Sequence, residues 1–410
     1  MKMTQWINTR TPEELDRDAR QLFDDHFGTK PAGVWAAPGR VNVIGDHVDY
    51  AGGVSIPFAL TQMTALAVRL RSDQRVRIIS QAPGAIDPLS FEMELSEVGP
   101  KHPDNWAGYV VGVLWAGQQS GIWPNCPGMD IAIVSDVPVG SGLSSSAALE
   151  CAIAVAAFEL THGHAPSQEE RGQLVPVCMR AENDVVGAST GGLDQRASLF
   201  GVAGKALVID FHADTVTLVP FDLAAQDMVL LVADTNAPHA LNDGQYASRR
   251  GIIDEVSLAL VGEGKTLREI AAEQALSQAD AWAIEQGLDA SIVRRRLQHV
   301  VEETQRTLKA AEALQDADMA AFRQYMQESH ESLRDLYEVV TEELESAFQA
   351  AGRFGARMTG GGFGGSVIVL LPESEVEDTV AQISRAAADA GFPECSFLLA
   401  VPGDGARRLS

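Results

Sequence analysis

The chain has 410 residues, of which 46% are hydrophobic and 21% charged, so its composition excludes wholesale disorder and favours a globular protein of about two domains. A formal net charge of −25 argues against nucleic acid or an anionic membrane as a partner. The longest apolar run, residues 147–160, contains Glu150 and Glu159 and is too short and too charged to span a bilayer.

The cysteines and the N-terminal segment indicate the cellular compartment. Cys126, Cys151, Cys178 and Cys395 lie far apart, without a CxxC pair or a His/Cys cluster, as is typical of reduced thiols in a cytosolic protein. The polar, helix-like N-terminal segment has no apolar run of the kind that a signal peptide needs. We therefore expect a cytoplasmic protein.

The first half mixes strands with amphipathic helices. Runs rich in β-branched residues predict strands at 64–70, 76–80, 130–135, Lys205–Asp210 and Thr215–Pro220, the last two as a hairpin. Helical spacing of apolar residues predicts helices over 145–161 and 167–186.

The second half begins with a strand at 228–233, and long helices are predicted over 290–314 and 319–351. A glycine loop then leads into a predicted β-α-β unit with a strand at 366–371, a helix over 373–390 and a strand at 396–401. Strands mixed with runs of helices indicate an α+β fold. We place a domain boundary near residue 205, which gives an N-terminal domain over 1–205 and a C-terminal domain over 206–410.

The first motif, PGRVNVIGDHVDY at 38–50, crowds a cation, a histidine and two carboxylates between glycines. Asp46, His47 and Asp49 can accept and donate several hydrogen bonds, which suits the hydroxyl groups of a polyol. A surface turn with incidental charge is the alternative interpretation.

The second motif, VPVGSGLSSSAA at 137–148, lies between a predicted strand and a long apolar helix. Small residues let backbone N–H groups approach phosphate oxygens, with the helix dipole behind them. The motif matches neither the Walker A pattern nor the dinucleotide fingerprint. An ordinary helix cap is the alternative.

The third motif, MTGGGFGGS at 358–366, has five glycines before an apolar strand. Each such glycine destabilises a fold by roughly 0.5–1 kcal/mol relative to alanine unless the backbone needs it. We expect close packing of this backbone against the second motif or a sugar, and a flexible linker is the alternative.

The first motif resembles the signature of the galactokinases, and the other two are similar to motifs of the GHMP kinase superfamily. The likeness covers almost the whole chain, and it implies a two-domain GHMP kinase fold. The N-terminal domain would hold a mixed sheet with helices, the C-terminal domain would be ferredoxin-like, and the active site would lie between them. It also implies an ATP- and magnesium-dependent kinase that phosphorylates the C1 hydroxyl of galactose, as in the Leloir pathway. We expect a monomer.

The resemblance also implies roles for individual residues. Asp194, in a segment similar to GxxDQ, would accept the proton of the anomeric hydroxyl, and Arg40 would keep it ionised. The sugar would bind Asp46, His47, Asp49, Gly191 and Tyr246. ATP would bind Trp106, Gly140, Ser141, Gly142, Leu143, Ser144, Ser145 and Ser146, and magnesium would bind Ser146 and Glu182.

Two departures from the family pattern concern the sugar. Position 46 is aspartate where many members have glutamate, and the loop before Asp194 reads Thr190-Gly191-Gly192-Leu193 where a cysteine and bulkier residues are common. A kinase for an N-acetylated or otherwise modified galactose therefore stays open. A galactose- and ATP-responsive binding protein derived from a kinase is a second alternative, and turnover on a panel of sugars separates the three.

Overall fold

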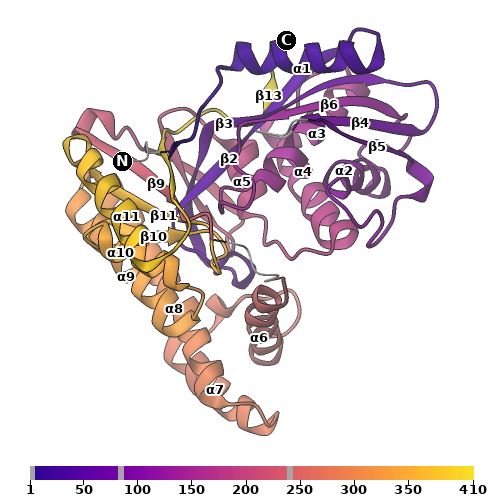
Figure 1. The fold of residues 1–410 in the computed structure, drawn as a ribbon. Helices are drawn as coiled ribbons and strands as arrows, with labels where there is room; N and C mark the ends of the chain where they lie inside the picture. Colours follow the sequence, from indigo (N-terminus) through magenta and orange to yellow (C-terminus); the bar gives the residue numbers. More distant parts are fainter. Residues whose placement is uncertain (1–4, 82–86, 238–242) are drawn as a thin grey trace.

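A computed structural model describes residues 5–81, 87–237 and 243–410, with the side chains of this set except those of 243–247. These residues form two β-sheets with helices packed on them (Figure 1). This is the two-domain α+β fold that the sequence predicts. In the described residues no helix combines the length and apolar character needed to cross a membrane.

The larger sheet has eight described strands in the order β13-β2-β3-β6-β4-β5, with β7 and β8 continuing from β3. Neighbouring strands are antiparallel except for β4 and β6, which are parallel. The strands are β2 (Gly33–Ile44), β3 (Val54–Leu70), β4 (Arg75–Gln81), β5 (Leu89–Glu94), β6 (Met129–Ser135), β7 (Lys205–Asp210), β8 (Thr215–Pro220) and β13 (Arg407–Arg408). The predicted strands of the first half, including the hairpin, are confirmed.

Helices cover both faces of this sheet. Helix α1 (Pro12–Phe27) packs on one face through Leu15, Ala19 and Phe23. The other face is covered by α2 (Gly108–Gln119), α3 (Ser145–His162), α4 (Gln168–Arg180) and α5 (Leu193–Phe200). Helix α4 continues as a π-helical segment, η3 (Ala181–Val186), so the two helices predicted from the sequence are confirmed.

The smaller sheet has the strand order β1-β12-β9-β11-β10. Its strands are β1 (Gln5–Trp6), β9 (Met228–Asp234), β10 (Ala356–Thr359), β11 (Ser366–Pro372) and β12 (Ser396–Ala400). Strands β11 and β12 both run antiparallel to β9, so they are parallel to each other. Helix α11 (Val376–Ala390) connects them. The predicted β-α-β unit is therefore present, with β9 inserted between its two strands.

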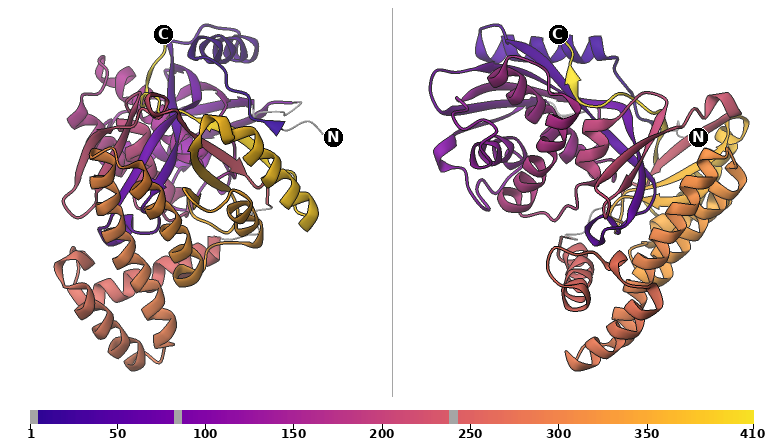
Figure 2. Two further views of the ribbon diagram at one scale, coloured as in Figure 1. Left: turned by 90° about the vertical axis from the view of Figure 1, so that its left-hand side faces the viewer. Right: turned by 180° about the vertical axis from the view of Figure 1, so that it is seen from behind.

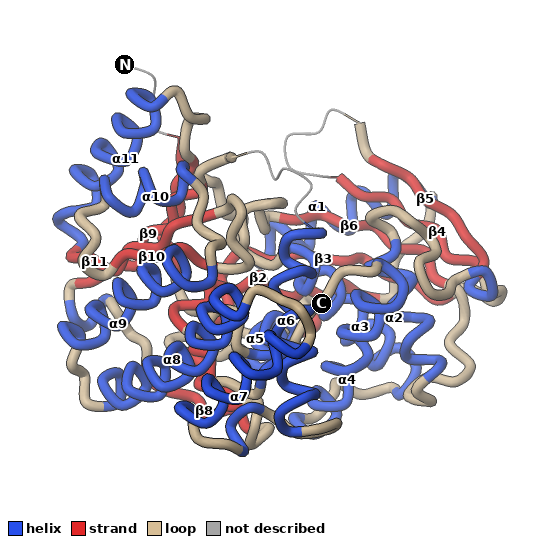
Figure 3. The backbone as a smooth tube through the Cα atoms, turned by 90° about the horizontal axis from the view of Figure 1, so that it is seen from below, coloured by secondary structure: helices blue, strands red, loops and turns tan. Residues whose placement is uncertain are grey.

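The remaining helices belong to the second half: α6 (Asp243–Val261), α7 (Ala272–Glu285), α8 (Ala290–Gln315), α9 (Met319–Ser332) and α10 (Glu342–Ala350). Figures 1 and 2 show α6 and α7 extending away from both sheets. From below, α8 and α9 lie along the smaller-sheet half, and α2 to α4 lie on the other side (Figure 3).

The single helix predicted over 319–351 is wrong. The chain forms α9, then a π-helical segment, η6 (Leu333–Tyr337), and then turns at Glu338, whose φ is 61°. Thr341 caps the new helix α10 by accepting a hydrogen bond from the Leu344 N–H. A left-handed residue ends a helix, and apolar periodicity does not reveal such a break because it continues on both sides.

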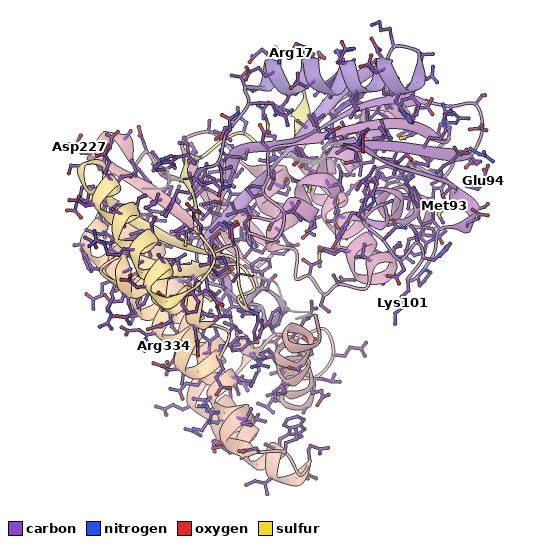
Figure 4. All side chains as sticks on the ribbon, viewed as in Figure 1. Arg17, Met93, Glu94, Lys101, Asp227 and Arg334 are labelled. Atoms are coloured by element: carbon purple, nitrogen blue, oxygen red, sulfur yellow. The ribbon has the colours of Figure 1, made fainter. Side chains whose placement is uncertain are left out.

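Short helical turns complete the described elements: η1 (Asp49–Ala51), η2 (Leu95–Glu97), η4 (Ala224–Gln226), η5 (Leu267–Glu269) and η7 (Glu373–Glu375). Charged side chains such as Arg17, Lys101 and Asp227 project from the surface (Figure 4).

The two halves share buried surface. One apolar cluster joins Val41 and Phe58 of the larger sheet to Val232 and Ile368 of the smaller one. The ends of the chain also cross over, because β1 pairs with β12 and β13 pairs with β2. The division near residue 205 stays a proposal.

Candidate active site

Two pockets meet at one pair of side chains. The first pocket has a volume of about 310 Å³ and is lined by Arg40, Asp46, His47, Asp49, Glu182, Gly187, Ala188, Ser189, Thr190, Gly191, Leu193, Asp194 and the 360–363 segment. The second, which we call the loop pocket, has about 220 Å³ and is lined by Arg40, Pro138, Gly140, Gly142, Leu143, Ser144, Ser145, Ser146, Asp194 and Gly361. Both pockets therefore include Arg40, Asp194 and Gly361.

Arg40 and Asp194 form an ion pair at this junction. The Nε and Nη2 atoms of Arg40 each lie 2.8 Å from Oδ1 of Asp194. The hydroxyl of Ser144 donates to the other oxygen, Oδ2. Asp194 lies in the first turn of α5, and Arg40 lies on β2. The ion pair therefore connects a helix and a strand that both line the site. Such charge-assisted hydrogen bonds stabilise an ionised carboxylate.

Arg40 is also tied to the glycine-rich loop. Its guanidinium donates from Nη1 to the carbonyl of Gly142, and its backbone N–H donates to the carbonyl of Leu143 at 3.1 Å. These contacts fix the loop relative to the carboxylate of Asp194, so the first and second motifs form one unit.

The third motif packs against the same loop. A Cβ added at Gly360 would lie 3.0 Å from the Gly142 carbonyl oxygen, and one added at Gly142 would lie 3.0 Å from the Thr359 carbonyl oxygen. The Ser366 hydroxyl donates to the Ser141 carbonyl at 2.7 Å. The expected close packing of the third motif against the second is confirmed, and the flexible-linker interpretation is wrong.

The loop leads directly into helix α3. Ser144 occupies the N-cap position of α3 with a left-handed φ of 57°, and its hydroxyl donates to Asp194 instead of capping the helix. The first backbone N–H groups of this 18-residue helix lie at the loop pocket with the positive end of the helix dipole. This arrangement suits an anion such as a phosphate.

Asp46 lines the first pocket, and its carboxylate is paired with an arginine that the sequence did not single out. Arg357, on β10, is fully buried, and its Nη2 donates to Oδ2 of Asp46. Burial raises the pKa of Asp46, and the charge of Arg357 opposes that rise. The pair keeps one carboxylate oxygen fixed in the wall of the pocket.

His47 is held by aromatic and backbone contacts. Its ring lies 4.7 Å from that of Tyr337, which lies 4.7 Å from that of His299. Nε2 of His47 is 3.2 Å from the Gly361 carbonyl, so this nitrogen carries a proton. Burial, with the neighbouring His299 second, lowers the pKa of His47 to about 3. His47 is therefore a neutral hydrogen-bonding group.

The side chain of Asp49 lies against the backbone of Gly191 in the lining of the first pocket. A Cβ added at Gly191 would stand 2.1 Å from Oδ2 of Asp49, so only glycine permits this approach. Loss of hydration, with the charge of Asp194 second, raises the pKa of Asp49 to about 6. The site thus places the carboxylate of Asp194 close enough to that of Asp49 to raise the pKa of Asp49.

Glu182 and Ser146 carry side-chain oxygen atoms of the kind that Mg²⁺ prefers as ligands. Burial, with Asp194 second, raises the pKa of Glu182 to about 7, and hydrogen bonds with Gln195 and Ser146 oppose that rise. Across the part of the chain that the structure describes, no group of three or more His, Cys, Asp or Glu side chains could hold a metal. A protein site of one carboxylate and one hydroxyl fits a Mg²⁺ ion whose other ligands are phosphate oxygens and water.

Three predicted residues stand apart from this geometry. Trp106 is not among the described residues that line the two pockets. It packs with Phe91, and the two ring centroids are 6.5 Å apart. Ser141 is buried and its hydroxyl donates to the Pro138 carbonyl at 3.1 Å. The side chain of Tyr246 lies outside the described residues. Their roles stay predictions.

Sequence reasoning missed several residues that support the site. They are Arg357, His299, Tyr337 and Glu150, all buried, with Gln195 noted only as part of a motif. A charged residue inside the short apolar strand 356–359 is a signal that could have found Arg357. His299 and Tyr337 carry no such signal, because their relation to the first motif depends on how distant helices pack.

Comparisons with known proteins agree with this geometry. Three family models match the chain: the galactokinase galactose-binding signature at residues 21–70, the GHMP kinases N-terminal domain at 108–202, and the GHMP kinases C-terminal domain at 310–389. The first covers Arg40, Asp46, His47 and Asp49, and the second covers the loop and Asp194.

Curated relatives match over nearly the whole chain. The chain is 40% identical to the galactokinase of Streptomyces coelicolor, over 95% of this chain and 97% of that protein. It is 37% identical to the galactokinase of Homo sapiens, over 97% of each. A crystal structure of Lactococcus lactis galactokinase complexed with galactose superposes with a TM-score of 0.82 at 29% identity, covering 95% of this chain and 98% of that one.

Proposed function

Because the chain belongs to the galactokinase family of the GHMP kinases, we propose that it transfers the γ-phosphate of ATP to the C1 hydroxyl of galactose. The product would be galactose 1-phosphate, as in the Leloir pathway. One observation carries the proposal: the Arg40–Asp194 pair lies where the first pocket meets the loop pocket. A sugar in one pocket and a triphosphate in the other would meet at this pair.

Asp194 takes the proton of the attacking hydroxyl in this proposal. A loose phosphoryl-transfer transition state places little charge on the attacking oxygen, so the proton leaves late and a weak base suffices. Arg40 and the Ser144 hydroxyl hold the carboxylate in place through charge-assisted hydrogen bonds. The same geometry would also serve if Asp194 acted by electrostatics alone.

The sugar binds in the first pocket. Asp46 and Asp49 accept hydrogen bonds from its hydroxyls, and neutral His47 and the backbone at Gly191 complete the contacts. We assign Tyr246 to this group on the family pattern alone. Of these residues, Asp46 has a buried cationic partner in Arg357, which fixes its orientation.

The triphosphate lies against the loop pocket. Gly140, Gly142, Leu143, Ser144, Ser145 and Ser146 line it at the start of α3, and Ser141 belongs to the same loop. Trp106 is assigned to the adenine by the family pattern. Ser146 and Glu182 would hold Mg²⁺, which supplies neutralisation of phosphate charge when bound. The loop's backbone N–H groups orient the phosphates for in-line attack.

Location and assembly complete the proposal. The four cysteines are free and buried, which suits a reducing compartment, so we place the reaction in the cytoplasm. The protein would act as a monomer on galactose and ATP.

The test is a coupled ADP-release assay with Mg-ATP and, separately, galactose, glucose, N-acetylgalactosamine, arabinose and mevalonate. Phosphorus NMR of the product identifies the phosphorylated carbon. We expect a galactose-dependent signal with phosphate on C1. Turnover only with another sugar would show that the first pocket binds that sugar rather than galactose. Binding of ATP and galactose without turnover would indicate a sensor.

A further inference from the structure

A single side-chain amide joins two carboxyl groups behind the loop pocket. Nε2 of Gln195 donates to Oε2 of Glu150 at 2.9 Å and to Oε2 of Glu182 at 2.8 Å. The three residues come from α5, α3 and η3, so the amide connects three separate helical segments.

All three side chains are removed from water. Glu150 and Gln195 are fully buried, and Glu182 is 9% exposed and lines the first pocket. Oε1 of Glu150 has no hydrogen-bond partner among the described residues. A buried, incompletely satisfied carboxyl group costs free energy, so its presence behind a site calls for a functional reason.

The orientation of the Gln195 amide follows from its partners. Both neighbouring carboxyl oxygens are acceptors, so the NH₂ end must face them, and each of its two hydrogens has one acceptor. The carbonyl end accepts a hydrogen bond from the Thr190 hydroxyl at 3.3 Å. An apolar side chain could not make these bonds, and asparagine is one methylene too short to reach both carboxyl groups from the same backbone position.

We propose that Gln195, anchored by Glu150, is a positioning residue that holds Glu182 ready to receive the divalent cation of the nucleotide. The inference rests on the proposed function, in which Glu182 and Ser146 are the protein's ligands to Mg²⁺. The amide already fixes one oxygen of Glu182. The carboxylate therefore loses little side-chain conformational entropy when the cation binds.

The position of Glu182 explains why such an anchor is needed. It stands in the π-helical segment η3, just before the 187–192 loop that lines the first pocket. Glu182 also has a hydrogen bond with Ser146, and the bond from Gln195 adds a second contact that restricts its rotamers. Groups that orient a metal ligand typically change metal affinity or activity by about 10–100-fold when they are mutated.

The experiment is isothermal titration calorimetry of ATP, once with Mg²⁺ and once with EDTA, on the full-length protein. We call the ratio of the two ATP affinities, with Mg²⁺ and with EDTA, the magnesium-dependent gain. A variant that loses structure in general weakens both affinities alike, so that loss does not change the ratio. We expect Gln195→Asn to reduce this gain by about 10–100-fold, with galactose affinity unchanged. Gln62→Asn is the matched control, because Gln62 is also buried but donates to Thr9 at 2.6 Å.

Substitutions of Glu150 distinguish the effect of its hydrogen bond to Gln195 from the effect of its charge. Glu150→Gln offers an amide carbonyl to the same N–H and should keep most of the gain, whereas Glu150→Leu removes the anchor and should lose it. If Gln195→Asn does not fold, Thr190→Val replaces it, since it removes the bond to the amide carbonyl and should reduce the gain.

The outcomes distinguish the two proposals. A folded Gln195→Asn protein with the wild-type gain would overturn the positioning role and leave the proposed kinase activity standing. A wild-type protein that binds ATP no tighter with Mg²⁺ would overturn the metal role of Glu182 and this inference with it. Galactose phosphorylation is measured separately, so its absence would bear on the proposed function alone.

Discussion

Arg357 and Asp46 form a buried ion pair at the wall of the first pocket, with Nη2 of the arginine donating to Oδ2 of the aspartate. Arg357 precedes the third motif and Asp46 belongs to the first, so this pair ties a strand of the smaller sheet to the first motif. It also gives a reason for the position of the aspartate carboxylate.

Removing Arg357 should damage both stability and sugar binding. Breaking a buried pair by deleting one partner typically costs about 3–5 kcal/mol, since the remaining charge is left uncompensated. We expect Arg357→Met to lose stability of this order in urea unfolding and to raise KM for galactose. Arg334→Met, at a more exposed ion-pairing arginine, should cost about 1 kcal/mol or less. Equal losses in the two variants would contradict the role given to Arg357.

Asp194→Asn should lose turnover without losing ATP binding. General-base catalysis is typically worth about 10²–10⁴-fold, so kcat should fall by that factor. Single-turnover kinetics and ATP calorimetry measure the two quantities. Asp214→Asn, which changes an exposed aspartate paired with Arg196, serves as the control and should leave kcat unchanged. Near-normal turnover in a folded Asp194→Asn protein would remove Asp194 from the mechanism.

Activity should depend on pH through Asp49. Its pKa is raised to about 6, so the carboxylate gains a proton as pH falls through that value and loses its capacity as a pure acceptor. We expect kcat/KM for galactose to fall below pH 6, about tenfold for each further pH unit, because kcat/KM reports ionisation in the free enzyme. Asp49→Asn should remove the step of Asp49 from this acid limb, leave the step of Glu182, whose pKa is raised to about 7, and lower kcat/KM at all pH values. An unchanged limb in the variant would assign the titration to another group.

Gly360→Ala should disturb the loop pocket more than the change in backbone preference alone. Gly360 and Gly264 both have a left-handed φ, 84° and 72°, so alanine costs about 1–2 kcal/mol at each. Only at Gly360 would the new Cβ press on the Gly142 carbonyl, at 3.0 Å, whereas at Gly264 it has open space. We therefore expect weaker ATP binding for Gly360→Ala and unchanged binding for Gly264→Ala. Matching ATP affinities would show that the contact is unimportant.

The parts of the site that the sequence predicts are those carried by short, continuous motifs. Arg40, Asp46, His47 and Asp49 lie within ten residues of one another, and the serines of the loop follow one another at 144–146. The proximity of residues within each motif therefore needs no knowledge of the fold, whereas the contact between the two motifs does. Asp194 stood out through the resemblance, and the structure places it 2.8 Å from Arg40. Runs rich in β-branched residues predict most strands, apolar periodicity predicts the helices, and their mixture indicates the α+β fold.

The supporting residues could not be predicted because they depend on tertiary packing. His299 lies on α8, whose periodic pattern resembles a solvated helix, yet the histidine is buried and its Nε2 is 3.2 Å from the Asp46 carbonyl. Tyr337 lies in the π-helical break that periodicity hid. Glu150 looked like an interruption of an apolar helix, and its partner Gln195 is 45 positions away along the chain.

The crossed ends of the chain bear on how substrates can enter. Within its described parts, the chain passes between the sheets three times: after Trp6, between Pro220 and Met228, and between Ala400 and Arg407. If the two halves opened as a hinge, all three connections would have to bend together and the shared apolar cluster would have to separate. The two halves are therefore connected at several points. This favours entry of sugar and nucleotide by local rearrangement of the loops around the pockets rather than by a rigid-body opening of the two halves.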